Sequence, residues 1–454
     1  MSEIKKLSTG KVWCFAMGQF GWSLLAALIS SWLVSYYQPD QATQAAGQPI
    51  FIPQGLAVLG IVTVLGAITA IGRIFDAVTD PMIASFSDRC KAKAGRRIPF
   101  MKAAAIPFAL SCILTFWSPV SGESWGNAFF LFVMLMLFYL FMTMYCTPYN
   151  ALIPELGSSQ KTRMAISTSI SFTYIAGMAV AYVAPVLWGL VQGFGFERVT
   201  AIRLTFTVLS IIGMVCMFIP VFTIRERDYV VIHPSDAGAF TSLTATFRNR
   251  DFRIFVASDI AYFLGLTMFQ TALPFFVTTL LGLDESMSTV YFVLMTALSV
   301  LFYIPINKLT PRLGKKRLIL IAFVIFTVSF AFTSIVGSFL PIPTVVQGYI
   351  MCIIAAPALA TFGILPQAVV ADIAESDALE TRENRSGMFY AARTFAFKLG
   401  QSLAMLLVTA LATIRQDTGL GYRIIAISAA AVCLLGGILF LKYDEKKIYA
   451  KILK

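Results

Sequence analysis

Long runs of apolar residues, separated by short polar segments, follow one another along the whole chain. Most of these runs reach the roughly 20 residues that an α-helix needs to cross a bilayer. The pattern therefore predicts an all-α membrane protein with twelve transmembrane helices in two six-helix halves. We expect the helices within residues 12–37, 55–86, 98–118, 127–153, 164–189, 201–224, 254–279, 288–307, 318–338, 345–371, 389–413 and 422–441.

The composition excludes a soluble globular protein. Hydrophobic residues make up 58% of the 454 residues and charged residues 13%, with a mean hydropathy of +0.79, whereas soluble domains contain about 45–50% apolar and 25% charged residues. The only histidine, His233, lies in a polar segment, and the chain has no GxxxxGK[ST] sequence. Neither an enzyme nor a bound cofactor is indicated.

The positive charges alternate between the two sides of the predicted membrane domain. Of the 35 Lys and Arg residues, 27 lie in the two tails and in every second gap between helices, and the other gaps hold only Arg198 and Arg415. By the positive-inside rule, both termini are cytoplasmic. The net charge of +12 therefore reflects a basic cytoplasmic face on a lipid bilayer, and no nucleic-acid partner is expected.

A long polar gap divides the chain into halves. Residues 225–253 predict a cytoplasmic linker between an N-terminal half, 1–224, and a C-terminal half, 254–454. A Gly-Arg-Arg sequence at 95–97 and a Gly-Lys-Lys-Arg sequence at 314–317 occupy equivalent places in the halves. Any short inside loop attracts Lys and Arg, but the matched pair favours a parallel repeat, as in major facilitator transporters with a midplane substrate site.

The second predicted helix carries three charges at membrane depth. Offsets of three and seven residues place Arg73, Asp76 and Asp80 within about 60° of one another on a helix, and Thr79 adds a hydroxyl beside them. Two carboxylates and a hydroxyl are oxygen ligands suited to a small hard cation or a proton. The alternative is a buried ion-pair network between Arg73 and the two aspartates. Lys398, in the eleventh predicted helix, is expected to pair with a carboxylate or to contact substrate.

These residues carry a resemblance to a known family. The stretch from Arg73 to Pro81, followed by the basic loop and Arg-Arg-Ile-Pro at 96–99, resembles the second-helix signature of the glycoside-pentoside-hexuronide:cation symporters, the family of the bacterial melibiose permease. Residues 146–154, 371–375 and 387–401 support it. The resemblance implies a cation-binding role for Asp76 and Asp80. It further implies that Thr79 influences the choice of cation, that Thr143 lies near the site, and that Lys398 matches the lysine of the eleventh helix. We expect Lys398 and Arg73 to serve in coupling.

The sugar site of the family carries over less well. Galactoside carriers of the family bind sugar hydroxyls with one aspartate in the first helix and one in the fourth, and this chain has Ser23 and Cys146 at these positions. The family also has an aromatic residue one turn after the fourth-helix aspartate, where this chain has Asn150. We expect the remaining substrate-lining groups among Gln19, Trp22, Tyr149, Arg393, Thr394 and Gln401. Arg393 either binds an anionic substrate or pairs with a protein carboxylate such as Asp372 or Glu375, which would favour a neutral sugar.

The resemblance implies a secondary active symporter that couples a Na⁺ or H⁺ gradient to sugar or glycoside uptake by alternating access. The alternative is a cation-coupled transporter of an amphipathic lipid such as a lysophospholipid. We expect no cofactor besides the co-transported cation, function as a monomer, and a place in the bacterial cytoplasmic membrane.

Overall fold

The computed structural model describes residues 7–56, 60, 62–90, 92, 95–156, 160–229, 246–337, 340–381 and 386–452. His233 and the middle of the expected linker lie outside the described residues. The chain folds as two compact units. The first unit comprises Met1–Pro39, Thr43–Ala57 and Ala67–Asp236, and the second comprises Asp40–Ala42, Val58–Gly66 and Ala237–Lys454.

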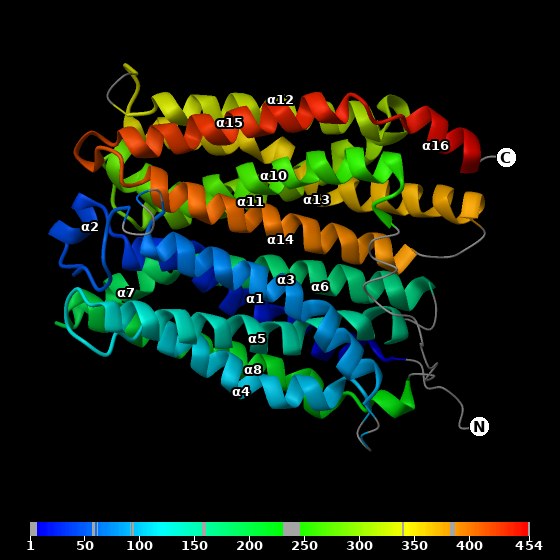
Figure 1. The fold of residues 1–454 in the computed structure, drawn as a ribbon, viewed down its shortest axis with the longest axis horizontal. Coiled ribbons are helices and arrows are strands. Elements are labelled where there is room, and N and C mark those ends of the chain that lie inside the picture. The colour runs from blue at the N-terminus through cyan, green and yellow to red at the C-terminus, as the bar shows by residue number, and fades with distance from the viewer. Residues whose placement is uncertain are drawn as a thin grey trace. The chain divides into compact units, whose positions relative to one another are not determined.

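The first unit is built from long helices (Figure 1). The first residues of α2 and of α3 belong to the second unit. Ser8 caps the first helix by accepting the Lys11 N–H. The elements are α1 (Thr9–Tyr37), α2 (Gln41–Ala45), α3 (Val64–Asp88), α4 (Ile98–Thr115), α5 (Trp125–Leu156), α6 (Gln160–Tyr182), α7 (Ala184–Gly193), α8 (Arg198–Thr223) and the short η1 (Glu226–Asp228).

The second unit has the same kind of construction. Its first helix is capped by Asn249, which accepts the Phe252 N–H at 3.1 Å. The elements are α10 (Arg250–Phe275), continued by the π-helical turn η2 (Phe276–Leu280), then α11 (Met287–Leu313), α12 (Lys315–Ile335), α13 (Thr344–Thr381), α14 (Ser386–Leu411), η3 (Gln416–Thr418), α15 (Leu420–Phe440) and α16 (Glu445–Ile452).

The same neighbours recur within each unit. In the first unit α1 packs against α6 and α8, and α4 packs against α5 and α8. In the second unit α10 packs against α14 and α15, and α12 packs against α13 and α15. Because the order of these helices along the chain matches as well, the two units have the packing of parallel repeats.

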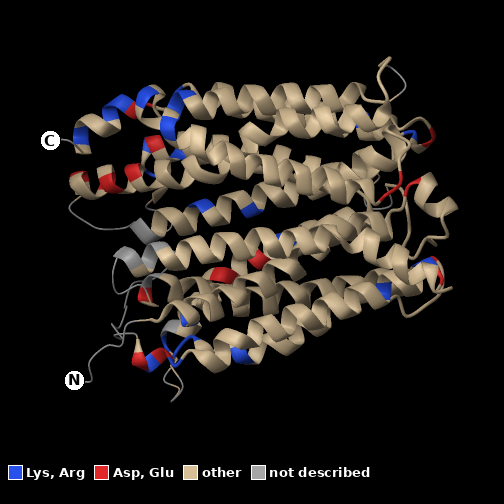
Figure 2. Ribbon diagram, turned by 180° about the vertical axis from the view of Figure 1, so that it is seen from behind, with Lys and Arg blue, Asp and Glu red and all other residues tan. Residues whose placement is uncertain are grey.

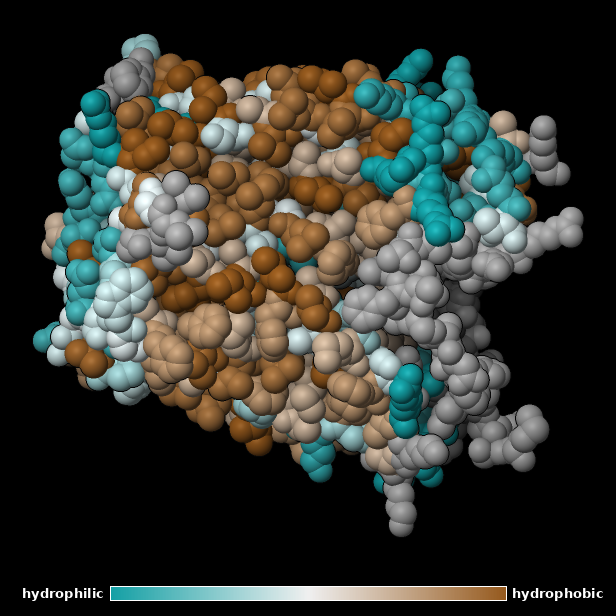
Figure 3. Space-filling model, viewed as in Figure 1, coloured by the Kyte–Doolittle hydropathy of each residue, from teal (hydrophilic) through white to brown (hydrophobic). Residues whose placement is uncertain are grey.

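The long helices have the length of membrane spans. Within the described residues, eleven segments are long and apolar enough to cross a membrane. A twelfth long helix of this part of the chain, α3, has 25 residues and differs by its internal charges Arg73, Asp76 and Asp80. On the face seen in Figure 3, apolar side chains cover much of the surface and hydrophilic ones gather toward its left and right edges. This is an all-helical membrane protein, as the hydropathy pattern predicts.

A glycine turn in the first unit precedes α4. Gly95 has a φ of +119°, and a Cβ there would lie 2.2 Å from a Glu226 carboxylate oxygen, so only glycine fits. The Glu226 carboxylate accepts the backbone N–H groups of Arg96, Arg97 and Ile98 at 3.0, 2.8 and 3.2 Å. A carboxylate from beyond α8 therefore supplies the anion that the N-terminus of α4 favours.

The second unit repeats this turn before α12. Gly314 has a φ of +81°, and its Cβ position is 2.8 Å from an oxygen of Glu445. Glu445 accepts the N–H groups of Lys315 and Lys316 at 2.7 and 3.0 Å. The matched sequences at 95–97 and 314–317 thus form the same structure, and in Figure 2 many charged residues gather at helix ends.

The tenth span differs from the expected one in length. The sequence predicted a helix within residues 345–371. In the structure α13 continues without a break to Thr381 and has 38 residues. Residues 382–385 of the mixed-charge stretch lie outside the described residues.

Candidate functional site

Polar side chains on α3 face polar side chains on α5. Their spacing is three and four residues on α3 and four on α5, so each set lies on one face of its helix. We call the two sets together the polar ladder. It consists of Arg73, Asp76 and Asp80 on α3 and Tyr139, Thr143 and Thr147 on α5.

Two rungs of the polar ladder join a carboxylate to a hydroxyl. The Thr143 hydroxyl donates to Asp76 Oδ1 at 2.7 Å, and both residues are buried. The Thr147 hydroxyl donates to Asp80 Oδ1 at 3.2 Å, in a half-buried position. Hydrogen bonds from these hydroxyls stabilise ionised carboxylates inside the protein. The structure therefore brings together Asp76, Asp80 and Thr143, which the sequence singled out.

The third rung replaces the ion pair expected for Arg73. Its guanidinium carbon lies 5.1 Å from the centre of the Tyr139 ring, and its Nε has no hydrogen-bond partner among the described residues. No ion pair joins Arg73 to either aspartate in the part of the chain that the structure describes. Gly72 makes the stacking possible, because a Cβ there would lie 2.6 Å from the Tyr139 ring. Arg73 is held by a cation–π contact.

Thr147 is a candidate site residue that sequence reasoning missed. It lies four residues after Thr143, and that spacing was the signal that could have found it. Thr79, which the sequence included, is buried and donates its hydroxyl proton to the Asp76 carbonyl at 3.1 Å within its own helix. The Thr79 hydroxyl proton is therefore used within α3, and only the oxygen lone pairs remain available.

The polar ladder offers only oxygen atoms at its two carboxylate rungs. Carboxylate and hydroxyl oxygens are the ligands that small hard cations take in proteins, and a carboxylate of this kind also accepts a proton. The rotatable hydroxyl of a Thr can either donate to a carboxylate or offer a lone pair to a cation. These residues fit Na⁺ or H⁺ as a transported ion.

The first unit gives several expected substrate residues structural partners. The Ser23 hydroxyl donates to the carbonyls of Phe20 and Tyr174 at 3.1 and 3.4 Å. The Tyr149 hydroxyl donates to the Phe15 carbonyl at 2.8 Å, and the rings of Tyr149 and Phe15 stack at 4.3 Å. These hydroxyl groups tie α1 to α6 and α5, so Ser23 and Tyr149 have a structural role between these helices.

Trp22 has a different environment. Its indole Nε1 is buried and has no hydrogen-bond partner among the described residues, and its ring lies 6.3 Å from the Tyr174 ring. Gln19 is buried, Cys146 is half-buried and Asn150 is exposed. Trp22 is thus an aromatic surface with an available donor, the combination that sugar sites use.

In the second unit, the structure gives Arg393 a partner that the sequence did not suggest. Arg393 pairs with Asp259 of α10, whereas Asp372 pairs with Lys315 at 2.5 Å. The Thr394 hydroxyl donates to the Tyr390 carbonyl at 3.0 Å. Lys398 and Gln401 lie farther along α14 and are half-buried.

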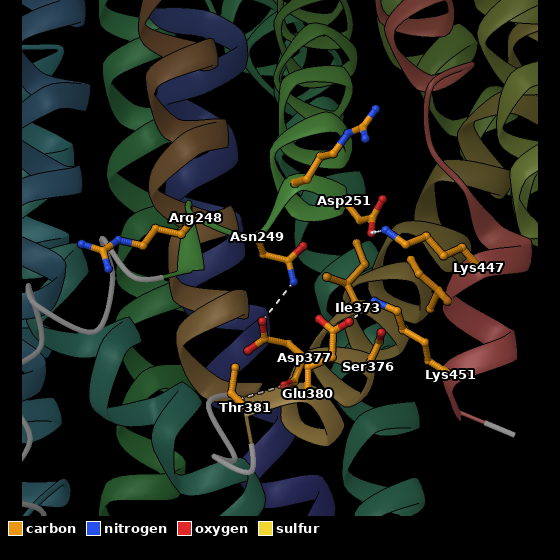
Figure 4. Close-up of a pocket in the computed structure, with 12 residues that line it drawn as sticks. Arg248, Asn249, Asp251, Ile373, Ser376, Asp377, Glu380, Thr381, Lys447 and Lys451 are labelled. Atoms are coloured by element: carbon orange, nitrogen blue, oxygen red, sulfur yellow. Dashed lines mark hydrogen bonds and ion pairs between the residues drawn. The ribbon is translucent and has the colours of Figure 1, made fainter. Parts of the chain in front are cut away.

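A separate cavity of about 490 Å³ opens in the second unit between the start of α10, the end of α13 and α16 (Figure 4). Four of the charged residues that line it form ion pairs: Lys447 pairs with Asp251 at 3.7 Å, and Lys451 pairs with Glu380. Arg248 points away from the other labelled residues in Figure 4. Since these wall charges already have protein partners, we assign no substrate to this cavity.

The fold and the polar ladder define a class of protein. Long membrane-spanning helices in two units of repeated packing, with carboxylates at membrane depth in α3, are the features of a secondary transporter of the major facilitator type. A family model described as MFS/sugar transport protein matches residues 14–435. The chain belongs to this family, the glycoside-pentoside-hexuronide:cation symporters. It is a cation-coupled symporter and not an enzyme.

Individual relatives are distant. The uncharacterized symporter YnaJ of Bacillus subtilis is 25% identical over 409 residues, which cover 88% of this chain and 82% of YnaJ. The putative glycoside/cation symporter YagG of Escherichia coli is 30% identical over 195 residues, covering 43% and 42% of the two chains. A solved structure of a mutant of the nucleoside transporter NupG has a TM-score of 0.68 at 13% identity, covering 96% of this chain and 100% of that chain. This last similarity shows the fold alone.

Proposed function

We propose that the protein couples a Na⁺ or H⁺ gradient to the uptake of a sugar or glycoside by alternating access. The observation that supports the proposal is the pair of carboxylate–hydroxyl rungs, Asp76 with Thr143 and Asp80 with Thr147. Charges at membrane depth are costly, so a helix retains two carboxylates there for a function. Cation binding at these carboxylates neutralises the α3 face, and Lys398 links that binding to substrate.

A sugar is the substrate class that the candidate groups favour. Trp22 offers an aromatic face and a buried N–H donor, and sugars present both apolar faces and hydroxyls. Gln19, Cys146, Asn150, Thr394 and Gln401 remain candidates for the hydroxyl contacts. The relative YagG carries the description of a glycoside/cation symporter, which agrees with this choice.

Uptake into proteoliposomes tests the proposal. The purified protein is reconstituted and offered labelled glycosides and pentosides with a Na⁺ gradient, a pH gradient or neither. We expect accumulation of at least one sugar with one of the gradients. Gradient-driven uptake of lysophospholipid, with none of any sugar, would instead establish the lipid carrier.

Thr147 should contribute to cation affinity. A hydrogen bond or ligand contact to a charged group is worth about 1.5–3 kcal/mol, so Thr147→Val is expected to raise the half-saturating cation concentration by about tenfold or more. Thr147→Ser should preserve it. The matched control is Thr207→Val, which removes a hydroxyl that bonds to the Arg203 carbonyl within α8. An unchanged cation dependence in Thr147→Val would exclude Thr147 from the site.

We further propose that both termini face the cytoplasm of a bacterial cell, in its cytoplasmic membrane. In a background without native cysteines, Glu123→Cys and Asp417→Cys should react with a membrane-impermeant maleimide in intact cells. Arg227→Cys and Lys446→Cys should react only after permeabilisation. All four residues are exposed, so access is decided by the membrane. The reverse labelling pattern would invert the topology.

A further inference from the structure

A second pair of charges lies at membrane depth, apart from the polar ladder. Arg393 of α14 donates from Nε to Asp259 Oδ2 at 2.7 Å and from Nη2 to Oδ1 at 3.1 Å. The Arg393 side chain is 7% exposed and that of Asp259 is 3% exposed. The fork of the guanidinium therefore engages both oxygens of one buried carboxylate, which is the strongest pairing that these groups form.

Aromatic rings lie beside the Arg393 guanidinium. The guanidinium carbon of Arg393 lies 5.8 Å from the Phe255 ring centre and 5.7 Å from that of Phe263. Those two residues stand four positions before and after Asp259 on α10, and Phe263 stacks on Phe397 of α14 at 4.5 Å. Packing of α10 against α14 thus holds Arg393 on Asp259, so the guanidinium is pre-arranged for this carboxylate.

The pairing decides what Arg393 offers to a solute. Asp259 already occupies the Nε–Nη2 edge of the guanidinium, one of the two edges that could bind a sugar carboxylate at two points. A uronide reaching Arg393 would place its carboxylate against that of Asp259 in a desolvated setting, and like charges so placed repel strongly. The pair as a whole has no net charge.

We propose that Asp259 is a specificity-determining residue that neutralises Arg393 and restricts the transported sugars to uncharged ones. This inference rests on the proposed sugar symport and narrows its substrate class. Asp259 acts through Arg393, as a positioning residue, and the anionic-substrate interpretation of Arg393 is set aside.

Competition by matched sugar pairs tests the inference. Uptake of a labelled sugar by full-length protein in proteoliposomes is measured against glycosides and their uronides, which differ only in CH₂OH or COO⁻ at C6. In the wild type, the neutral member should compete at a concentration at least about 100-fold lower than the uronide. In Asp259→Asn this ratio should fall at least about tenfold, and in Asp259→Asn/Arg393→Gln it should rise again.

The selectivity ratio separates this role from a purely structural one, because lost folding lowers uptake of both members alike. Asp251→Asn, which removes the other aspartate of α10, is the matched control and should leave the ratio unchanged. If Asp259→Asn does not fold, the inference is tested by two selectivity ratios. These are the ratio of the wild type and the ratio of Asp259→Glu, which keeps a carboxylate at this position.

Two adverse results have different meanings. Wild-type transport of the uronide that is lost in Arg393→Gln would overturn the inference and leave sugar symport standing. Gradient-driven uptake of neither member of any pair would remove the proposed function, and the inference with it.

Discussion

Asp76→Asn and Asp80→Asn should each abolish cation-driven accumulation, so that the sugar only equilibrates across the membrane. A unit charge at about 4 Å from a cation is worth about 4 kcal/mol at an effective dielectric constant of ~20, which corresponds to roughly a thousandfold in cation affinity. Asparagine keeps the size of the side chain and an acceptor oxygen for Thr143 or Thr147. The loss should therefore appear in coupling and not in folding.

The measurement compares sugar accumulation with and without a cation gradient in proteoliposomes. Elution of each variant from a sizing column at the wild-type volume shows that it is folded. Asp417→Asn, in an exposed turn, removes an aspartate outside the ladder and should accumulate sugar normally. Full accumulation by both ladder variants would refute the cation site.

The proposed cation site could be predicted from the sequence because one helix contains most of its residues. Spacing alone places Asp76 and Asp80 on one face of α3, and their charge within an apolar run marks them as functional. The membrane spans follow from hydropathy for the same reason, since each is a local property of about 20 residues. The paired turns at Gly95 and Gly314 were visible as short matching sequences.

Side-chain partners that come from distant parts of the chain could not be predicted from the sequence in this way. Asp259 lies 134 residues before Arg393, and only the packing of α10 on α14 shows which carboxylate Arg393 takes. Ser23 and Tyr149 have residue types suited to a sugar site, but their hydroxyls bond backbone carbonyls of neighbouring helices. When a helix is apolar on all sides, its sequence pattern does not show which residues face the protein interior and which face a neighbouring helix.

Glu226→Ala should severely lower the stability of the first unit. The Glu226 residue is 2% exposed, and its carboxylate accepts three backbone N–H groups at the start of α4. Its removal leaves these donors without their acceptor. It also takes a negative charge away from the buried Arg96 and Arg97, whose side chains pair with Glu155. Each buried donor left without an acceptor costs about 1–3 kcal/mol.

That cost should lower the melting temperature in detergent by on the order of 10 °C. The melting temperature is measured by heating the protein and recording the loss of its peak on a sizing column. Glu226→Gln keeps acceptor capacity without the charge and should fall between wild type and alanine. Glu445→Ala removes the corresponding carboxylate at the start of α12, which accepts only two N–H groups. It should therefore lower the melting temperature by less. Glu123→Ala, at an exposed residue, is the control for loss of a glutamate. If Glu226→Ala and Glu123→Ala have the same melting temperature, the Glu226 carboxylate does not stabilise the turn. Gly95, Arg96 and Arg97 would then hold the turn without it.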